Sequence, residues 1–322
     1  MQIVTRWTDE ANTDFNKIET LLLQKHSDEV PENGAKYLNW KIEKIFEENK
    51  DIVLNGRTVT YNYYTYSVDQ IPGGTEDLED GTYTKTGFLI PYSSNGKIRY
   101  IISRNSYAQT YLRKMLFYTG RGEIVNNSVG FTGDIFVWLI SKVYSSENQI
   151  QSESDALVDL SIDSIKGFKG NTEDFLAKVS MSGESVMNIF SALSFLIESQ
   201  NLNQITVDLS YRGHTNIEIS LNNKNTIGFA EDKYLGELNQ SSREEIIAVC
   251  FLTLYTEIIP ILLQKYQSDI DTNMWGQGKC VEFLEKLRAD LSEKIANRIE
   301  DLNSRPEQLK LNFNPEDSSL EC

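Results

Sequence analysis

The sequence predicts an α+β protein in which antiparallel sheet carries helices on one face and the C-terminal region is helical. Three observations predict this class. Apolar and polar residues alternate over 205–211 and 217–221, as in strands with one buried face. A turn at 212–214 joins these strands and makes them antiparallel. Residues 186–197 carry apolar side chains three and four positions apart, as expected of a helix that packs on such a face.

Residues 1–150 are expected to form a first α+β domain, which begins with two helices. Residues 14–26 and 35–49 both carry apolar residues three and four positions apart. Asn55 and Gly56 then mark a tight turn that leads into an alternating strand over 58–68. The remaining elements of this domain are an exposed acidic loop, a second hairpin and two helices, over 69–81, 86–103, 106–118 and 133–144.

Residues 151–304 are expected to form a second domain, an antiparallel β/α domain with C-terminal helices. The polar run 145–154 is the expected boundary between the two domains. Residues 158–162 alternate apolar side chains with serine and aspartate, which is typical of a half-buried strand. A shorter strand is expected over 175–181.

The C-terminal helices show clear start and stop signals. A serine at 241 or 242, followed three residues later by a glutamate, is a capping-box pattern that begins a helix. Pro260 should kink or end that helix, because proline lacks the backbone N–H that an interior position needs. A last helix is expected over 281–302, and residues 305–322 are expected to be a tail.

Composition limits the partners and the compartment. The chain has 31 Lys or Arg against 47 Asp or Glu, a net charge of −16, which disfavours nucleic acid or anionic membrane binding over the whole surface. Three widely spaced cysteines and an N-terminus without an apolar run favour a cytoplasmic protein. The apolar run 246–263 contains Glu257 and Pro260, so a buried helix is expected there and no membrane contact.

One segment reverses this charge. Residues 81–145 hold eight Lys or Arg against two acids, a local net charge of +6, so the remaining residues carry −22. Tyrosine, phenylalanine and tryptophan are interleaved with these cations. Such a segment is expected to be the part of the surface that a negatively charged ligand approaches.

In and just before the helix expected over 106–118, helical spacing would place Arg104, Tyr107, Tyr111, Lys114 and Tyr118 on one face, because they are three and four positions apart. Cations neutralise phosphates and tyrosine rings stack on bases, so this face suits single-stranded nucleic acid or a nucleotide. Alternatively, the tyrosines are half-buried and the cations pair with the protein's own carboxylates. The predicted ligand-binding residues are Arg99, Arg104, Tyr107, Tyr111, Arg113, Lys114, Tyr118 and Arg121.

Whether the protein is an enzyme stays open at this point. The sequence has only two histidines and no phosphate-binding loop, dinucleotide fingerprint or zinc-ligand spacing, so no resident metal or cofactor is expected. An alternative is a metal-dependent nuclease in which outward carboxylates hold Mg²⁺ or Mn²⁺. Its candidate catalytic residues are Asp159, Asp163, Asp208 and Glu218. Ser220 occupies the position at which such nucleases have a lysine. The four acids can also be explained as polar residues on the solvent-exposed side of a sheet.

The leading functional hypothesis is therefore a non-catalytic binding or adaptor protein with a protein partner. The last helix, the acidic residues 76–80 and the alternating tail residues 309–313 are candidate docking segments. The Asn-, Ile- and Lys-rich composition suggests a bacterial accessory complex, of which phage defence is one example.

Overall fold

The structure is a computed structural model of the 322-residue chain, and it describes residues 1–26, 35–71, 82–104, 106–152, 155–172, 178–182 and 199–304. Met1–Gly276 forms one compact unit, and a second unit begins at Gln277. The predicted division near residue 150 stays a prediction. The predicted helix over 186–197, most of the loop over 69–81 and the tail over 305–322 lie outside the described residues.

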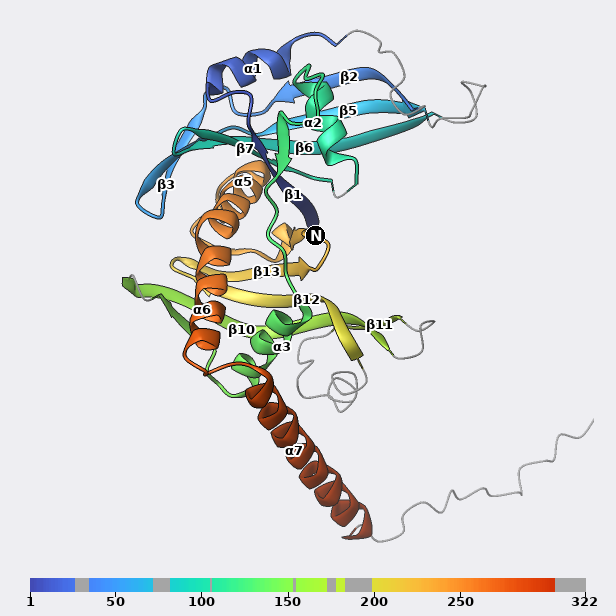
Figure 1. Cartoon of the computed structure of the whole chain (residues 1–322), viewed down its shortest axis with the longest axis vertical. Coiled ribbons are helices and arrows are strands. Elements are labelled where there is room, and N and C mark those ends of the chain that lie inside the picture. Colours follow the sequence, from blue (N-terminus) through green and yellow to red (C-terminus); the bar gives the residue numbers. More distant parts are fainter. Residues whose placement is uncertain are drawn as a thin grey trace, which may run out of the picture. The chain divides into compact units, whose positions relative to one another are not determined.

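The predicted α+β class is confirmed (Figure 1). Every strand pair in the described part of the chain is antiparallel, and the main order is β11-β10-β12-β13-β14-β1-β7-β6-β4-β3. The strands are β1 (Gln2–Asp9), β2 (Lys36–Lys44), β3 (Lys50–Leu54), β4 (Arg57–Tyr61), β5 (Tyr64–Ile71), β6 (Tyr83–Ser94), β7 (Lys97–Ile102), β8 (Ile124–Asn126), β9 (Gln149–Ser152), β10 (Asp155–Thr172), β11 (Lys178–Ser182), β12 (Ser199–Tyr211), β13 (His214–Asn222), β14 (Ile227–Phe229) and β15 (Leu235–Gly236).

Strand β1 joins the strands of the two halves of the chain. Its first residues pair with β14, in the register Gln2 to Phe229, and its later residues pair with β7, in the register Arg6 to Ile101. A single strand therefore belongs to both groups of strands. Arg6 lies just after the point where β1 changes partner.

The two predicted hairpin turns are confirmed. Asn55-Gly56 links β3 to β4, and Asn95-Gly96 links β6 to β7. All four residues have positive φ angles, between 51° and 68°. Asparagine and glycine tolerate this left-handed backbone, which matches the twist of a two-residue hairpin.

The helix predicted over 35–49 is wrong, because these residues form β2 and pair with β5. The apolar spacing that resembled a helix comes from a bulge at Asn39, which has a φ angle of 53° and shifts the register. After the bulge, Trp40 and Ile42 alternate with exposed Lys41 and Glu43 and contact the core. A strand with one bulge shows apolar residues three positions apart as well as two, and for this reason residues 35–49 resemble a helix in the sequence.

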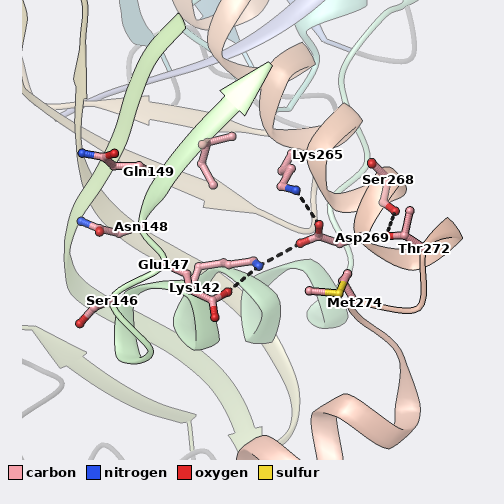
Figure 2. Close-up of a pocket in the computed structure, with 11 residues that line it drawn as sticks. Lys142, Ser146, Glu147, Asn148, Gln149, Lys265, Ser268, Asp269, Thr272 and Met274 are labelled. Carbon is pink, nitrogen blue, oxygen red and sulfur yellow. Dashed lines mark hydrogen bonds and ion pairs between the residues drawn. The ribbon is translucent and has the colours of Figure 1, made fainter. Parts of the chain in front are cut away.

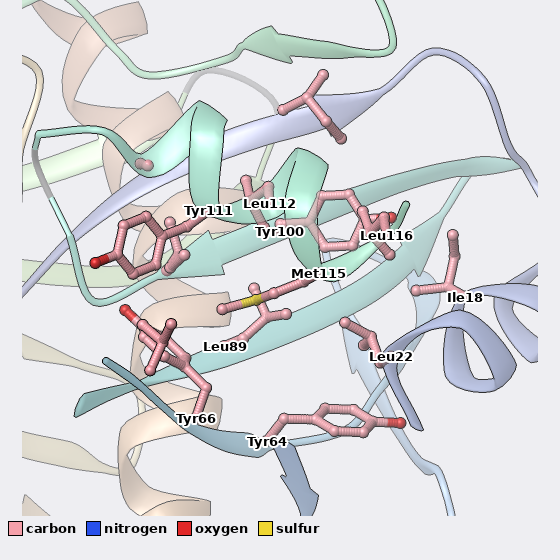
Figure 3. Close-up of a cluster of buried hydrophobic side chains, with 14 of the residues drawn as sticks. Ile18, Leu22, Tyr64, Tyr66, Leu89, Tyr100, Tyr111, Leu112, Met115 and Leu116 are labelled. Carbon is pink, nitrogen blue, oxygen red and sulfur yellow. The ribbon is translucent and has the colours of Figure 1, made fainter. Parts of the chain in front are cut away.

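Helices cover both faces of β6 and β7. Helices α1 (Phe15–Leu23) and α2 (Ala108–Met115) lie on one face, whereas α5 (Arg243–Thr253) lies on the other, where Phe251 contacts Phe88 (Figure 1). Figure 3 shows the core on the first face, where side chains of both helices meet the strands. Its central members include Ile18, Leu22, Tyr64, Leu89, Tyr100, Tyr111, Leu112 and Met115.

The strands predicted in the second half are confirmed within β10, β12 and β13. Helix α3 (Gly133–Tyr144) has the predicted bounds and packs against β10 and β12. Ser242 caps α5 and accepts a hydrogen bond from the Glu245 backbone N–H at 3.2 Å, as the capping pattern predicts.

Pro260 does not end the helical stretch, and the irregularity near it begins before the proline. A π-helical turn (η3, Leu254–Ile258) follows α5, and α6 (Ile259–Asp271) begins with Pro260 in its first turn. Proline is tolerated there because the wide turn before it changes the hydrogen-bond pattern. The stretch Arg243–Asp271 is long and apolar enough to cross a membrane, but 72% of its apolar window is buried inside the fold, as in the core helix of a soluble protein.

Helix α7 (Gln277–Ser304) confirms the predicted last helix and extends it at both ends. It belongs to the second compact unit. Phe283 and Leu287 are buried, whereas apolar side chains further along the helix are exposed.

Candidate anion-binding site

The structure does not place the five predicted residues of the basic-aromatic segment on one exposed helix face. Helix α2 begins only at Ala108, so Arg104 and Tyr107 precede it. Tyr107 is 67% exposed and has a φ angle of 58°, whereas Tyr111 is fully buried in the core. Lys114 is also buried. The predicted face therefore divides into a core part and an exposed part.

The buried cations Arg113 and Lys114 and the partly buried Arg104 contact aromatic rings and backbone carbonyls. The Arg104 guanidinium lies 3.9 Å from the centroid of the Tyr111 ring, and the Lys114 ammonium lies 5.0 Å from that of Tyr37. The Arg113 Nη2 donates to the Thr119 carbonyl at 2.9 Å. These contacts stabilise the fold through cation–π attraction and hydrogen bonding. They leave these groups poorly placed to reach a ligand.

Tyr118 is held by a buried carboxylate. Its hydroxyl donates to Asp9 Oδ2 at 2.7 Å, and the Tyr100 hydroxyl donates to the same oxygen at 2.6 Å. Burial raises the pKa of Tyr118, and the hydrogen bond to Asp9 raises it further. Arg121 is exposed, like Tyr107. A binding role for these two exposed residues stays a prediction.

Arg99 lies on the opposite face of the strands from Tyr111. Along β7, Ile98, Tyr100 and Ile102 contact the core under α1 and α2, so the alternation of a strand turns Arg99 toward the other face. Its cross-strand partner Tyr92 lies on that same face. The sequence grouped Arg99 with the α2 residues, but the strands separate them.

On this second face, Arg99 lines a cavity of about 210 Å³ that we call the arginine pocket. It is formed by strands β1, β3, β4, β6 and β7, the two Asn-Gly turns, the segment after β8 and the π-helical turn η3. Its lining residues are Arg6, Leu54, Asn55, Arg57, Val59, Tyr92, Ser94, Asn95, Arg99, Asn127, Tyr255 and Thr256. Among the described residues, the lining holds three arginines and no Asp or Glu, in a chain whose net charge is −16.

Arg6 is fixed in place by the protein. Its Nε donates to the Asn127 carbonyl at 2.8 Å, its Nη1 to the Tyr255 carbonyl at 3.1 Å, and its Nη2 to Asn127 Oδ1 at 3.4 Å. The guanidinium also lies 4.7 Å from the centroid of the Tyr255 ring. A guanidinium has five N–H donors, so at most two remain for a ligand, and one of these faces the Tyr92 hydroxyl. A cation held in this way loses little conformational entropy when it binds an anion.

The other two arginines are less constrained. The Arg99 Nη1 makes one long hydrogen bond, of 3.4 Å, to the Ser94 carbonyl. Arg57 is exposed at the start of β4, and no hydrogen bond or ion pair joins its side chain to another described residue. Most of the N–H donors of both side chains are therefore available to an anion.

The inner wall of the arginine pocket includes two buried tyrosines. Tyr92 and Tyr255 are 0% and 2% exposed. The Tyr255 hydroxyl has no hydrogen-bond partner in the described part of the chain, and the Tyr92 hydroxyl has only a weak contact with the Arg6 guanidinium. Burial raises the pKa of both hydroxyls, and the positive charge of Arg6 opposes the rise in each case. Leaving a buried hydroxyl unsatisfied is costly, so a bound oxygen atom from ligand or water would stabilise this wall.

A carboxylate lies beside the arginine pocket and is neutralised there. Glu257, in η3, is buried and accepts hydrogen bonds from the Asn55 backbone N–H at 2.6 Å and from Arg212 Nη1 at 3.2 Å. These contacts also fix the β3–β4 turn against the π-helical turn. π-Helical turns occur often at functional sites. Here the turn supplies Tyr255 and Thr256 to the pocket wall.

A larger cavity, of about 730 Å³, lies between α3, β9 and α6 (Figure 2). At its centre the buried Asp269 accepts from Trp138 Nε1 at 3.0 Å, Lys142 Nζ at 3.0 Å and Lys265 Nζ at 2.8 Å. Lys142 also pairs with Glu147. Two cations and two acids thus satisfy one another. This network holds the helices together and leaves no unbalanced charge for a ligand.

The predicted carboxylate face is only partly assembled. Asp208 and Glu218 are cross-strand partners, and each pairs with a lysine: Lys166 at 2.8 Å and Lys233 at 2.7 Å. Asp163 accepts from the Ser210 hydroxyl instead. The side chain of Asp159 lies outside the described residues. Among the described residues, no three His, Cys, Asp or Glu side chains come together as a metal site.

Comparison with known proteins does not supply an identity, since no protein-family model and no curated protein matches this chain. Arg99 is among the ligand-binding residues predicted from the sequence, whereas Arg6 and Arg57 are not. One signal was available: Arg57 directly follows an Asn-Gly turn, and a hairpin turn fixes the direction of the residues beside it.

Proposed function

We propose that this protein is a non-catalytic binding protein that recognises a phosphate-containing ligand in the arginine pocket. One observation carries the proposal: three arginines and no carboxylate line one cavity of a strongly acidic protein. Guanidinium groups match phosphate oxygens with paired N–H donors, and charge-assisted hydrogen bonds of this kind are strong. The arginine pocket thus supports the predicted binding of a phosphate-containing ligand. It includes the predicted residue Arg99, but it lies on the opposite face of the strands from Tyr111, which belonged to the predicted binding face.

The lining of the arginine pocket supports binding rather than catalysis. It contains no His, Cys, Asp, Glu or Lys, so it lacks the groups that most often transfer protons or attack a bound ligand near neutral pH. The raised pKa values of Tyr92 and Tyr255 keep their hydroxyls protonated. The pocket therefore offers positive charge and hydrogen-bond donors.

The proposal includes a protein partner and an adaptor role in a bacterial accessory complex of the cytoplasm. Helix α7 supports the partner, because it exposes apolar side chains that a second protein would cover. They are Val281, Ile295, Ile299 and Leu302.

Arg57→Ala is expected to weaken phosphate binding by tenfold or more. A hydrogen bond to a charged group contributes about 1.5–3 kcal/mol, and about 1.4 kcal/mol corresponds to a factor of ten in affinity. Because Arg57 is exposed and unpaired in the described structure, its removal leaves the fold intact. Isothermal titration of the full chain with methyl phosphate, at low salt, measures the change.

Arg298→Ala is the matched control, since it removes the same charge from an exposed site on α7. Wild-type affinity in both variants would contradict the proposal. The same samples, incubated with labelled single strands and Mg²⁺ or Mn²⁺, should return the strands uncut. Cleavage that Asp208→Asn abolishes would instead support the nuclease alternative.

A further inference from the structure

We infer that the ligand of the arginine pocket is a small phosphate monoester and not a nucleic-acid strand. The inference rests on the proposed function and deepens it, because it selects one class of phosphate compound. Three observations carry it: the size of the pocket, the charge of its lining, and the net charge of the chain.

The pocket has room for one phosphate group and a few further atoms. Its volume of about 210 Å³ is below the range of about 300–1,000 Å³ for pockets that enclose a whole drug-sized molecule. Buried Leu54, Val59, Tyr92 and Tyr255 bound it on the inside. A terminal phosphate enters such a space end-on, whereas an internal phosphodiester has a chain leaving on both sides.

The charge of the pocket favours a dianion. Three guanidinium groups remain protonated at any physiological pH, and no acid in the lining offsets them. A phosphomonoester carries about −1.5 to −2 at pH 7, because its second pKa is about 6. A phosphodiester lacks that second ionisation. The monoester therefore gains more from the same three cations.

The net charge of the chain disfavours a polyanion. The whole chain carries −16, and the residues outside 81–145 carry −22. A strand would bring further phosphates close to a negatively charged protein, whereas a small ligand brings its charge only to the pocket. The exposed Asn55 and Asn95 flank the mouth in the two hairpin turns, and their neutral amides suit the hydroxyl groups of a small sugar-like or nucleoside body.

Titration with a matched pair of probes tests the inference. Monomethyl phosphate at pH 7.5 should bind at least ten times more tightly than dimethyl phosphate or a short thymidine strand with hydroxyl ends. Its affinity should fall several-fold at pH 5, where the monoester has lost its second charge. The described lining has no His, Asp, Glu, Lys or Cys whose own titration would imitate this fall, and protonation of Glu257 beside the pocket would remove a negative charge and so would oppose it. Arg57→Ala should abolish the preference, and Arg298→Ala should keep it.

The two proposals fail in different ways. If dimethyl phosphate or the strand bound as tightly as the monoester, and Arg57→Ala removed that binding, the monoester inference would be overturned and the phosphate pocket would stand. If no probe bound, or Arg57→Ala changed nothing, the proposed function would fail together with the inference.

Discussion

Tyr111→Ala should lower the free energy of unfolding by about 3–5 kcal/mol, as large-to-small changes of buried aromatic residues do. The Tyr111 ring is fully buried and lies at ring-centroid distances of 5.5 Å from both Tyr37 and Trp40 and 6.0 Å from Tyr66. The Arg104 guanidinium covers another side of the ring. Removal of the Tyr111 ring would leave a cavity. The side chains around this cavity are held in place by the strands, so they can move only a little to fill it (Figure 3).

Tyr107→Ala is the matched control for this change. Tyr107 is 67% exposed, immediately precedes the same helix, and should change stability by less than about 0.5 kcal/mol. Urea unfolding followed by circular dichroism measures both variants. Equal and small effects would contradict the structure, because they would place Tyr111 on the surface, where the helical spacing of 104–118 predicted it.

Asp269→Ala should cost about 3 kcal/mol, since removing one partner of a buried ion pair leaves the other charge uncompensated. Asp269 is 2% exposed and accepts from Trp138 and two lysines. Its loss would leave the Trp138 N–H and the largely buried Lys142 without that partner (Figure 2). Asp271→Ala, on the exposed face of α6, is the control and should be close to neutral.

The contribution of Asp269 should depend on pH. Burial alone would raise the pKa of this carboxyl, but hydrogen bonds from Lys265, Trp138 and Lys142 outweigh it and lower the pKa below its usual value. The stabilisation is therefore fully present above the unfolded pKa of about 3.9, and it is lost as the pH falls through the lower folded value. The difference between wild type and Asp269→Ala should shrink below pH 4. A difference that grew in acid would contradict this assignment.

Local signals in the sequence predict much of the fold. The Asn-Gly pairs predict both hairpin turns, because few other residues accept their backbone angles. The alternation over 205–211 and 217–221 predicts the pairing of β12 with β13. The signal fails over 35–49, where the bulge at Asn39 interrupts the period of two. One extra residue in a strand is thus enough to make it resemble a helix.

The candidate site was much less predictable. Arg6, Arg57 and Arg99 come from three strands and meet only because β1, β4 and β7 belong to one sheet that packs against η3. Their positions in the sequence do not predict that these three residues lie close together. The predicted face on 104–118 extended the helical spacing back to Arg104 and Tyr107, but Tyr107 adopts a left-handed backbone and the helix starts after it. Of the three arginines, only Arg99 belongs to the basic segment 81–145, and it lies on the opposite face of the strands from Tyr111.

The most direct test of the arginine pocket is to locate a bound oxyanion. Crystals of the full chain soaked in sodium tungstate, a tetrahedral dianion, would show tungsten by its anomalous scattering. We expect a peak within hydrogen-bonding reach of the Arg6, Arg57 and Arg99 guanidinium groups, and a weaker peak in Arg57→Ala crystals soaked at a tungstate concentration that only half-saturates the wild type. A peak at the exposed Tyr107 and Arg121, or none in the arginine pocket at saturating tungstate, would contradict the account.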